Sequence, residues 1–450
     1  MKKRIFQTAL IVFGIVALVM LSSIFLRRDE GFVKNHDFYK TDEQYDVLYL
    51  GSSHAVMGIL PMEIWNEYGI TSFNLANGGQ KLTGDYWILK NALEQKKPEL
   101  VVLDAYGVML DTKWDETTVD FLHGSLDPMP LSKTKVDAVY DLVPEEKRIA
   151  FLWPFSVYHN RWQEINKNFF KSEVSYQKGA YENTDHMAPV VATMDRLPKL
   201  EHSDVNQSET VGKEYLRKCI KVCQEYDVPI LLTVIPFYGT DEELRYINSI
   251  YEIAEEYQVP YINGLEEDVV NPKCDFLDST HLNSSGARKW SSFLGAYMKE
   301  HYRLNDYRGD EAHASWNENY MGYRMYEQEQ LNQTADLYAY LMLLADGDFT
   351  GCIKISPDAY AYKDKMFWML LENVGVTERP EDKSAEVTLM FGDSSDEVQA
   401  QMPGNLGLPE DVDANVEILV FDTERREWVS HVGFHSDDRN QRVYPAVESE

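Results

Sequence analysis

The sequence is poor in cysteine and has no pattern of metal ligands. Only four of its 450 residues are cysteine, and these are Cys219, Cys223, Cys274 and Cys352. Four cysteines are too few for a disulfide framework, and none is spaced with histidine as metal ligands are. We therefore expect ordinary buried thiols, with a single disulfide as the alternative, and neither a metal nor another cofactor.

Basic residues are also scarce, with 43 Lys and Arg against 74 Asp and Glu and a net charge of −31. Nucleic-acid binding needs a basic surface, so this class of protein is excluded. Docking onto anionic lipid or wall polymer through bulk charge is disfavoured for the same reason. No glycine-rich phosphate loop or His-Glu-x-x-His motif occurs, so we expect no nucleotide.

The sequence has one long apolar run, residues 5–26. This run contains no charged residue and follows a basic N-terminus. Its 22 residues are enough to cross a bilayer core of about 30 Å. We predict an uncleaved, single-pass anchor at the cell membrane (residues 1–28, including a cytoplasmic tip), with residues 29–450 outside the cytoplasm. Ser22 and Ser23 lie inside the run, so a cleaved signal peptide is the alternative.

Beyond a polar stretch predicted to be a tether (29–44), apolar strands alternate with amphipathic helices. The expected strands are 47–50, 72–75, 100–103, 229–235 and 259–262, and the expected helices are 61–68, 82–95, 211–226, 241–257 and 284–302. Such alternation predicts an α/β domain over 45–305 with a parallel sheet between helices. Residues 109–210 lack this alternation of strands and helices and are interpreted as an insertion. Its aromatic segment 151–162 either lines a substrate groove or fills the insertion's own core.

The composition changes near residue 306. Helices are expected at 325–344 and 363–373, and strands at 351–356, 386–391, 416–421 and 428–434. This order predicts a smaller α+β domain over 306–450. Its strand pattern is similar to that of interleukin-like domains thought to bind sugars, which implies a carbohydrate-binding or partner-binding role.

Two short motifs carry the chemistry. The strand 47–50 ends at Gly51-Ser52-Ser53, where a hydroxyl on the turn is placed to act as a nucleophile or to cap a helix. Far along the chain, Asp278 and His281 lie three residues apart on one loop. That spacing lets a carboxylate hold one ring nitrogen while the other faces a serine.

Together, Gly-x-Ser after the first strand and Asp278-Ser-Thr-His281-Leu-Asn-x-x-Gly286 before the last helix resemble the SGNH/GDSL hydrolase superfamily. The resemblance covers roughly residues 45–300 and implies a flavodoxin-like fold. It also implies that Ser53, Asp278 and His281 are the catalytic residues.

The same resemblance implies three donors for an oxyanion hole. The first is the backbone N–H of Ser53, and the second is Gly79, with Gly78 as the alternative. The family's third donor is an Asn after the third strand, where this chain has Asp104-Ala105-Tyr106-Gly107. Asn77 is the candidate substitute.

The triplet Gly-Ser-Ser is similar to the membrane-anchored branch of the superfamily, which includes the D-alanyl transfer protein of teichoic acid synthesis and the alginate O-acetyltransferases. This implies serine-dependent transfer of an O-acetyl or D-alanyl group to or from a cell-surface polysaccharide or wall polymer. A multi-spanning membrane O-acyltransferase is the implied partner. The alternatives are a GDSL-type carbohydrate esterase and a non-catalytic SGNH-like scaffold.

Other residues are candidates for substrate contact or compete with the first motif. His54 adjoins the serine, and His159 and Arg161 suit a sugar or an acyl carboxylate, so these three are the expected substrate-binding residues. A second Gly-Asp-Ser occurs at Gly392-Asp393-Ser394, but no Asp-x-x-His follows it. We interpret it as a turn between strands.

Overall fold

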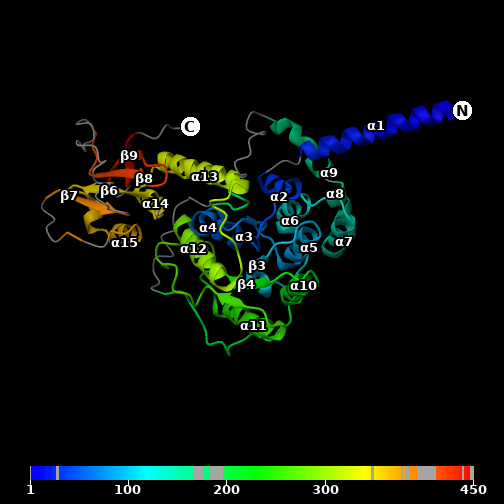
Figure 1. Cartoon of the computed structure of the whole chain (residues 1–450), viewed down its shortest axis with the longest axis horizontal. Helices are drawn as coiled ribbons and strands as arrows, with labels where there is room; N and C mark the ends of the chain where they lie inside the picture. The colour runs from blue at the N-terminus through cyan, green and yellow to red at the C-terminus, as the bar shows by residue number, and fades with distance from the viewer. Residues whose placement is uncertain are drawn as a thin grey trace.

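The computed structural model describes residues 2–26, 30–153, 155–165, 177–182, 196–345, 349–376, 379–380, 385–392, 412–437 and 440–445. Two five-stranded sheets organise the chain, one parallel and one antiparallel. Helices flank the parallel sheet, so the protein is mixed α/β, and one apolar helix lies at its N-terminus (Figure 1).

The parallel sheet has the strand order β2-β1-β3-β4-β5. Its strands are β1 (Val47–Leu50), β2 (Ser72–Asn74), β3 (Leu100–Asp104), β4 (Ile230–Val234) and β5 (Tyr261–Asn263). This is the flavodoxin-like order, in which the direction of winding reverses between β1 and β3. Ligands of open parallel sheets bind outside the carboxyl ends of the strands at this reversal.

Alternate residues of β1 point to opposite faces of the sheet, as the period of a strand requires. Leu48 and Leu50 pack in one core with α5 (Leu82–Leu93), α10 (Val211–Glu225) and α11 (Asp241–Tyr257). Val47 and Tyr49 pack in another with α3 (Ser53–Gly58), α4 (Pro61–Tyr68) and α12 (Ser284–His301). Figure 1 shows β3 and β4 between α12 and the pair α5 and α10.

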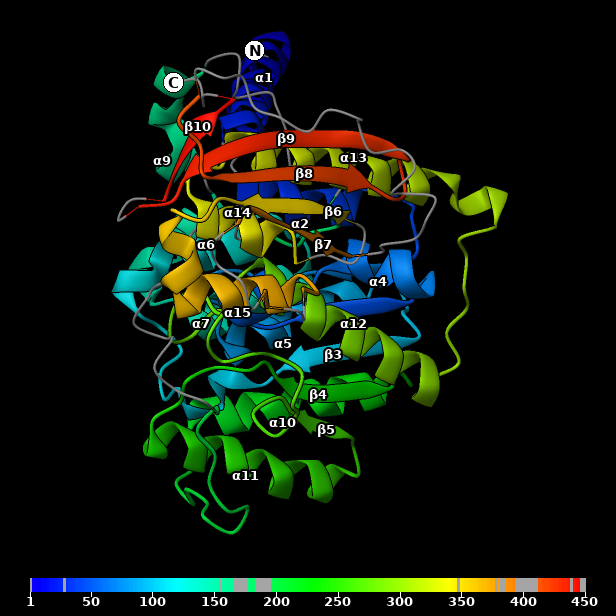
Figure 2. The ribbon, with the colours of Figure 1, turned by 90° about the vertical axis from the view of Figure 1, so that its left-hand side faces the viewer.

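The antiparallel sheet has the order β10-β9-β8-β6-β7 (Figure 2). Its strands are β6 (Phe349–Ile355), β7 (Val387–Phe391), β8 (Val416–Asp422), β9 (Glu427–His435) and β10 (Gln441–Tyr444). Helices α14 (Leu337–Leu343) and α15 (Lys365–Asn373) share its core. The long helix α13 (Ala314–Gln333) contacts both α4 and β9 and so connects the two sheets.

Two predictions about the elements differ from the structure, and two further elements were missed. The segment expected to be a tether contains α2 (Glu30–Lys40), because Phe38 is fully buried and holds it against the parallel-sheet unit. The stretch 325–344 is two helices, since Asp336 caps a new helix by accepting from the N–H groups of Tyr338 and Ala339. Strand β10 and helix α3 were not predicted.

The N-terminal helix α1 (Lys2–Leu26) is long and apolar enough to cross a membrane. Its candidate span is Lys3–Ser22, with a mean hydropathy of 2.4. A signal sequence near an N-terminus has the same properties.

The insertion after β3 is largely helical up to Glu164, whereas its described residues 177–182 and 196–210 form turns and irregular structure. It contains α6 (Val119–Leu126), α7 (Lys133–Leu142), α8 (Arg148–Leu152), α9 (Phe155–Tyr158) and the 3-10 helix η4 (His159–Glu164). The four cysteines are buried and free, which confirms the prediction of ordinary buried thiols.

Candidate active site

The turn after β1 presents Ser53. Gly51 adopts a φ of +143°, and a Cβ at this position would lie 2.7 Å from the Cβ of Asp104, so only glycine fits. Ser52 caps α3, and its side chain accepts from the N–H of His54 at 3.4 Å. Ser53 is therefore the first residue of α3, with a partly exposed side chain.

The loop before α12 holds its own acidic residue in place. Oδ1 of Asp278 accepts hydrogen bonds from the backbone N–H groups of Thr280 (2.7 Å) and His281 (2.9 Å) and from the Thr280 hydroxyl (2.8 Å). A carboxylate that bonds the backbone two residues on forms an Asx turn. Asn283 then caps α12 by accepting from the N–H of Gly286 at 3.1 Å.

These two segments meet in one hydrogen-bonded series. His281 Nε2 lies 2.8 Å from Ser53 Oγ, and His281 Nδ1 lies 2.9 Å from Oδ2 of Asp278. An ionised carboxylate can only accept, so Nδ1 carries the proton and the lone pair of Nε2 faces the serine hydroxyl. The structure thus brings Ser53, Asp278 and His281 together, and it is Ser53, not Ser52, that contacts the histidine.

The charge state of Asp278 suits this arrangement. Burial raises the pKa of its carboxyl, but the hydrogen bonds from His281 and Thr280 outweigh burial, and the net pKa is lowered to about 2. The side chain is ionised at any neutral pH. A fixed negative charge beside Nδ1 favours the protonated ring when Nε2 takes up a proton.

The glycine loop after β2 lies against the serine turn. The N–H of Asn77 donates to the carbonyl of Gly51 at 3.2 Å. The N–H of Gly78 donates to Oδ1 of Asn77 at 3.1 Å, so that donor is already used. Gly79 has a φ of +62°, and a Cβ there would lie 2.6 Å from the ring of Phe121. This geometry favours Gly79 over Gly78 as an oxyanion donor.

Asn77 is less suited to supply a third donor. Its Oδ1 accepts from Gly78, and its Nδ2 lies against α6, 3.0 Å from where a Cβ on Gly124 would be. The carboxamide therefore spans from the glycine loop to α6.

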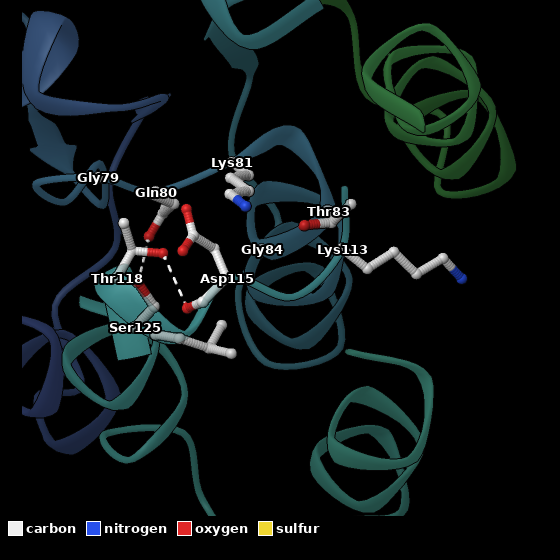
Figure 3. A pocket seen from close by; sticks show the side chains of 10 residues that line it. Gly79, Gln80, Lys81, Thr83, Gly84, Lys113, Asp115, Thr118 and Ser125 are labelled. Atoms are coloured by element: carbon white, nitrogen blue, oxygen red, sulfur yellow. Dashed lines mark hydrogen bonds between the residues drawn. The ribbon is translucent and has the colours of Figure 1, made fainter. Parts of the chain in front are cut away.

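A small hollow of about 20 Å³ opens beside Gly79 (Figure 3). Gln80, Lys81, Asp115 and Thr118 are among the polar residues that line it. Nζ of Lys81 is 2.9 Å from the hydroxyl of Thr112. Neither Ser53 nor His281 is among the residues that line it.

Of the three residues expected to contact substrate, His54 adjoins the series, with its ring centroid 5.3 Å from that of His281. His54 is only 3% exposed and stacks on Tyr106 with ring centroids 3.8 Å apart. Burial lowers the pKa of His54 to about 3, with the nearby His281 as a further cause, so the ring is neutral. It forms part of the wall behind His281, and this burial does not favour a substrate contact.

His159 and Arg161 lie beside α1. The ring of His159 contacts the carbonyl of Ser156 at 3.1 Å and is exposed to solvent. Arg161 donates from Nη1 to the carbonyl of Leu26 at 3.1 Å. Neither belongs to the hydrogen-bonded series of Ser53. Of the competing Gly-Asp-Ser motif, Asp393 and Ser394 fall outside the described residues.

Two buried carboxyls lie behind the serine turn. Burial raises the pKa of Asp104 to about 8, partly countered by hydrogen bonds from the backbone of Ile235 and Tyr106. Burial likewise raises the pKa of Asp85 to about 7, although the side chain of Gln80 donates to its Oδ1 at 2.6 Å. In the family that the sequence resembles, the segment after the third strand contains an Asn. Here that segment begins with Asp104, whose side chain packs against Gly51.

We expect Asp104→Asn to flatten the pH dependence of stability. Between the ordinary carboxyl pKa of about 4 and the folded value of about 8, the folded state binds more protons than the unfolded state. The free energy of unfolding of the wild type should therefore fall as the pH rises through this window. Urea unfolding at pH 5 and pH 8 would measure this fall, with the exposed Asp120→Asn as control. An unchanged slope in Asp104→Asn would contradict the assignment.

Sequence reasoning missed several residues of this site. Thr280 was not singled out, although Asp-x-Thr on a loop is a recognisable Asx-turn signal. Phe121 covers Gly79 and Tyr106 covers His54, and both contacts join segments far apart in the chain. No local pattern indicates such contacts.

Within the described ranges, no group of three or more His, Cys, Asp or Glu side chains could hold a metal ion. No protein-family model matches the sequence, and no curated protein is significantly similar to it.

Proposed function

We propose that this protein is a membrane-anchored, serine-dependent acyl-transfer enzyme of the SGNH/GDSL type. The observation that carries the proposal is the series Ser53 Oγ, His281 Nε2 and Nδ1, and Asp278 Oδ2, with 2.8 Å and 2.9 Å between partners. The serine follows the first strand of a flavodoxin-ordered sheet, at the point where the winding reverses.

The first step forms an ester on the serine. His281 Nε2 takes the hydroxyl proton as Ser53 Oγ attacks the acyl carbonyl carbon. Asp278 stabilises the imidazolium that results. The carbonyl oxygen becomes an oxyanion, and the backbone N–H groups of Ser53 and Gly79 are its proposed donors. When the tetrahedral intermediate collapses, the protonated His281 gives its proton to the leaving group.

The second step releases the acyl group. An incoming hydroxyl loses its proton to His281 Nε2 and attacks the ester carbonyl, and Ser53 recovers its proton from His281 as it leaves. A sugar or polyol hydroxyl gives transfer, and water gives hydrolysis. We propose transfer of an acetyl or D-alanyl group to a surface polysaccharide or wall polymer. In this proposal α1 is an uncleaved anchor, residues 29–450 lie outside the cytoplasm, and a multi-spanning O-acyltransferase supplies the acyl group.

Labelling with a fluorophosphonate probe tests the proposal directly. The activated Ser53 should be phosphonylated, because its hydroxyl has a base within hydrogen-bond distance. Mass spectrometry of the full chain in detergent should find the adduct on Ser53. Ser53→Ala should abolish labelling, whereas Ser52→Ala and Ser394→Ala should keep it.

The same experiment separates the alternatives. A folded chain that takes no label on Ser53 would favour a non-catalytic scaffold. A labelled chain that releases acetate from an activated ester at the same rate with and without added polysaccharide would favour a simple esterase over a transferase.

A further inference from the structure

Exposed apolar side chains are concentrated in one stretch of this protein. Outside α1, the described residues include thirteen large hydrophobic side chains that are exposed, and seven of them lie between Leu131 and Ile165. Five of the seven lie within residues 149–165, on or next to α8, α9 and η4, which contact one another in turn: Ile149 (64%), Trp153 (39%), Val157 (40%), Trp162 (62%) and Ile165 (41%). Single exposed apolar residues are ordinary, but a cluster indicates an interaction surface. We call these five residues the aromatic shelf.

The aromatic shelf lies beside the end of the apolar helix. Both α9 and η4 contact α1, and Figure 1 shows α9 next to the end of α1 that joins the body of the molecule. Arg161 of η4 is bonded to the carbonyl of Leu26, the last residue of α1. Leu26 is four residues beyond the candidate span, which ends at Ser22. Four residues of helix measure about 6 Å, which is the depth of an interfacial layer.

The net charge of the stretch 131–165 also differs from that of the whole chain. Residues 131–165 carry five basic and five acidic side chains and are neutral, while the chain has a net charge of −31. The repulsion from an anionic bilayer that the acidic surface produces is therefore relieved here. Tryptophan, present at two of the five positions, is enriched where hydrocarbon meets headgroups, because one end of the ring is apolar and the other is polar.

We infer that the aromatic shelf is inserted into the headgroup layer of the bilayer that α1 spans. A surface packed against α1 at the end of its span meets lipid when the helix crosses the bilayer, so the occupant is lipid rather than a soluble protein. The inference rests on the proposed membrane anchoring. It adds that the parallel-sheet unit lies directly on the membrane and is not held away from it by a tether.

Spin labels on the full chain test the inference. A nitroxide is attached at Trp162→Cys, at Leu18→Cys in α1, or at Tyr360→Cys. Tyr360 is 51% exposed and lies in the part of the chain that forms the antiparallel sheet. The native cysteines are buried, so the introduced thiol reacts selectively. Each protein is placed in nanodiscs of phosphatidylcholine and phosphatidylglycerol at one chain per disc. Collision rates with oxygen and with a water-soluble nickel complex are then compared.

The collision rate with the nickel complex should be lower for the label at Trp162→Cys than for the label at Tyr360→Cys, by roughly threefold or more. The lipid headgroups keep the nickel complex away from the first label. Equal collision rates at these two sites, with the Leu18→Cys label buried in lipid, would overturn the inference and leave the anchor intact. If the Leu18→Cys label also faces water, the proposed anchoring itself fails. Protection of Trp162→Cys that appears in crowded vesicles and not in single-chain discs would indicate self-association and overturn the lipid assignment.

Discussion

Ser53→Ala and His281→Ala should each lower acyl-ester turnover by about 10³-fold or more, and the double variant should be little slower than either. The two side chains act as one unit, because Ser53 Oγ is nucleophilic only while His281 Nε2, 2.8 Å away, accepts its proton. Once one is gone, the other has no further role to lose. Hydrolysis of p-nitrophenyl acetate by the purified full chain measures the effect. Losses that multiply in the double variant would contradict the shared mechanism.

Matched variants show whether the loss is specific. Asp278→Asn should cost less than His281→Ala, since the imidazole remains while its tautomer is no longer fixed. Ser52→Ala keeps the hydroxyl that contacts His281 and should stay within about twofold of the wild type. Ser394→Ala, in the competing motif, should do the same. A loss at Ser394 as large as that at Ser53 would mean that the second motif carries the activity.

Arg288→Met should have the largest effect on stability, lowering the free energy of unfolding by about 3–5 kcal/mol. Arg288 is buried on α12, and its Nη2 is 2.8 Å from Glu182 and 2.5 Å from Glu327. Its Nε is 3.4 Å from Glu63. Removing the guanidinium leaves several acidic groups in the interior with less positive charge to balance them. The shift in urea unfolding, followed by circular dichroism, measures the loss.

Arg308→Met is the matched control, because its ion pair with Asp306 is about two-fifths exposed on both sides. An exposed pair contributes below about 1 kcal/mol, so this variant should unfold close to the wild type. If both arginine variants lose the same stability, burial of the Arg288 network is not the cause.

Much of the first sheet could be predicted because its strands are continuous apolar runs and its helices have one apolar face. The predicted strand and helix over 47–50 and 61–68 coincide with β1 and α4. Short or polar elements gave no such signal: α3 has six residues beginning with serine, and α2 buries the polar residues Lys34 and Asn35 together with Phe38. Hydrophobic periodicity does not detect a helix whose buried face is largely polar.

The chemistry of the site could be predicted in part for a different reason. Asp278 and His281 are close in the chain, so their spacing alone indicates a pair. Ser53 is 228 residues from His281, and only the resemblance to a known family connected them before the structure placed the two atoms 2.8 Å apart. The position of His54 could not be predicted, because its burial depends on Tyr106, which follows another strand. The contact of Arg161 with the backbone of α1 could not be predicted either, because it joins residues 135 positions apart.

The loop that carries His281 leads directly into residues held by the second sheet's helices. The side chain of Asn283 contacts the sulfur of Met342 at 3.2 Å, and Asn373 of α15 donates to the hydroxyl of Ser285 at 2.7 Å. A chain cut after residue 305 would leave both positions exposed to water, two and four residues from the histidine. The last third of the protein therefore stabilises the loop that carries Asp278 and His281, and a shortened version for crystallisation or assay should retain it.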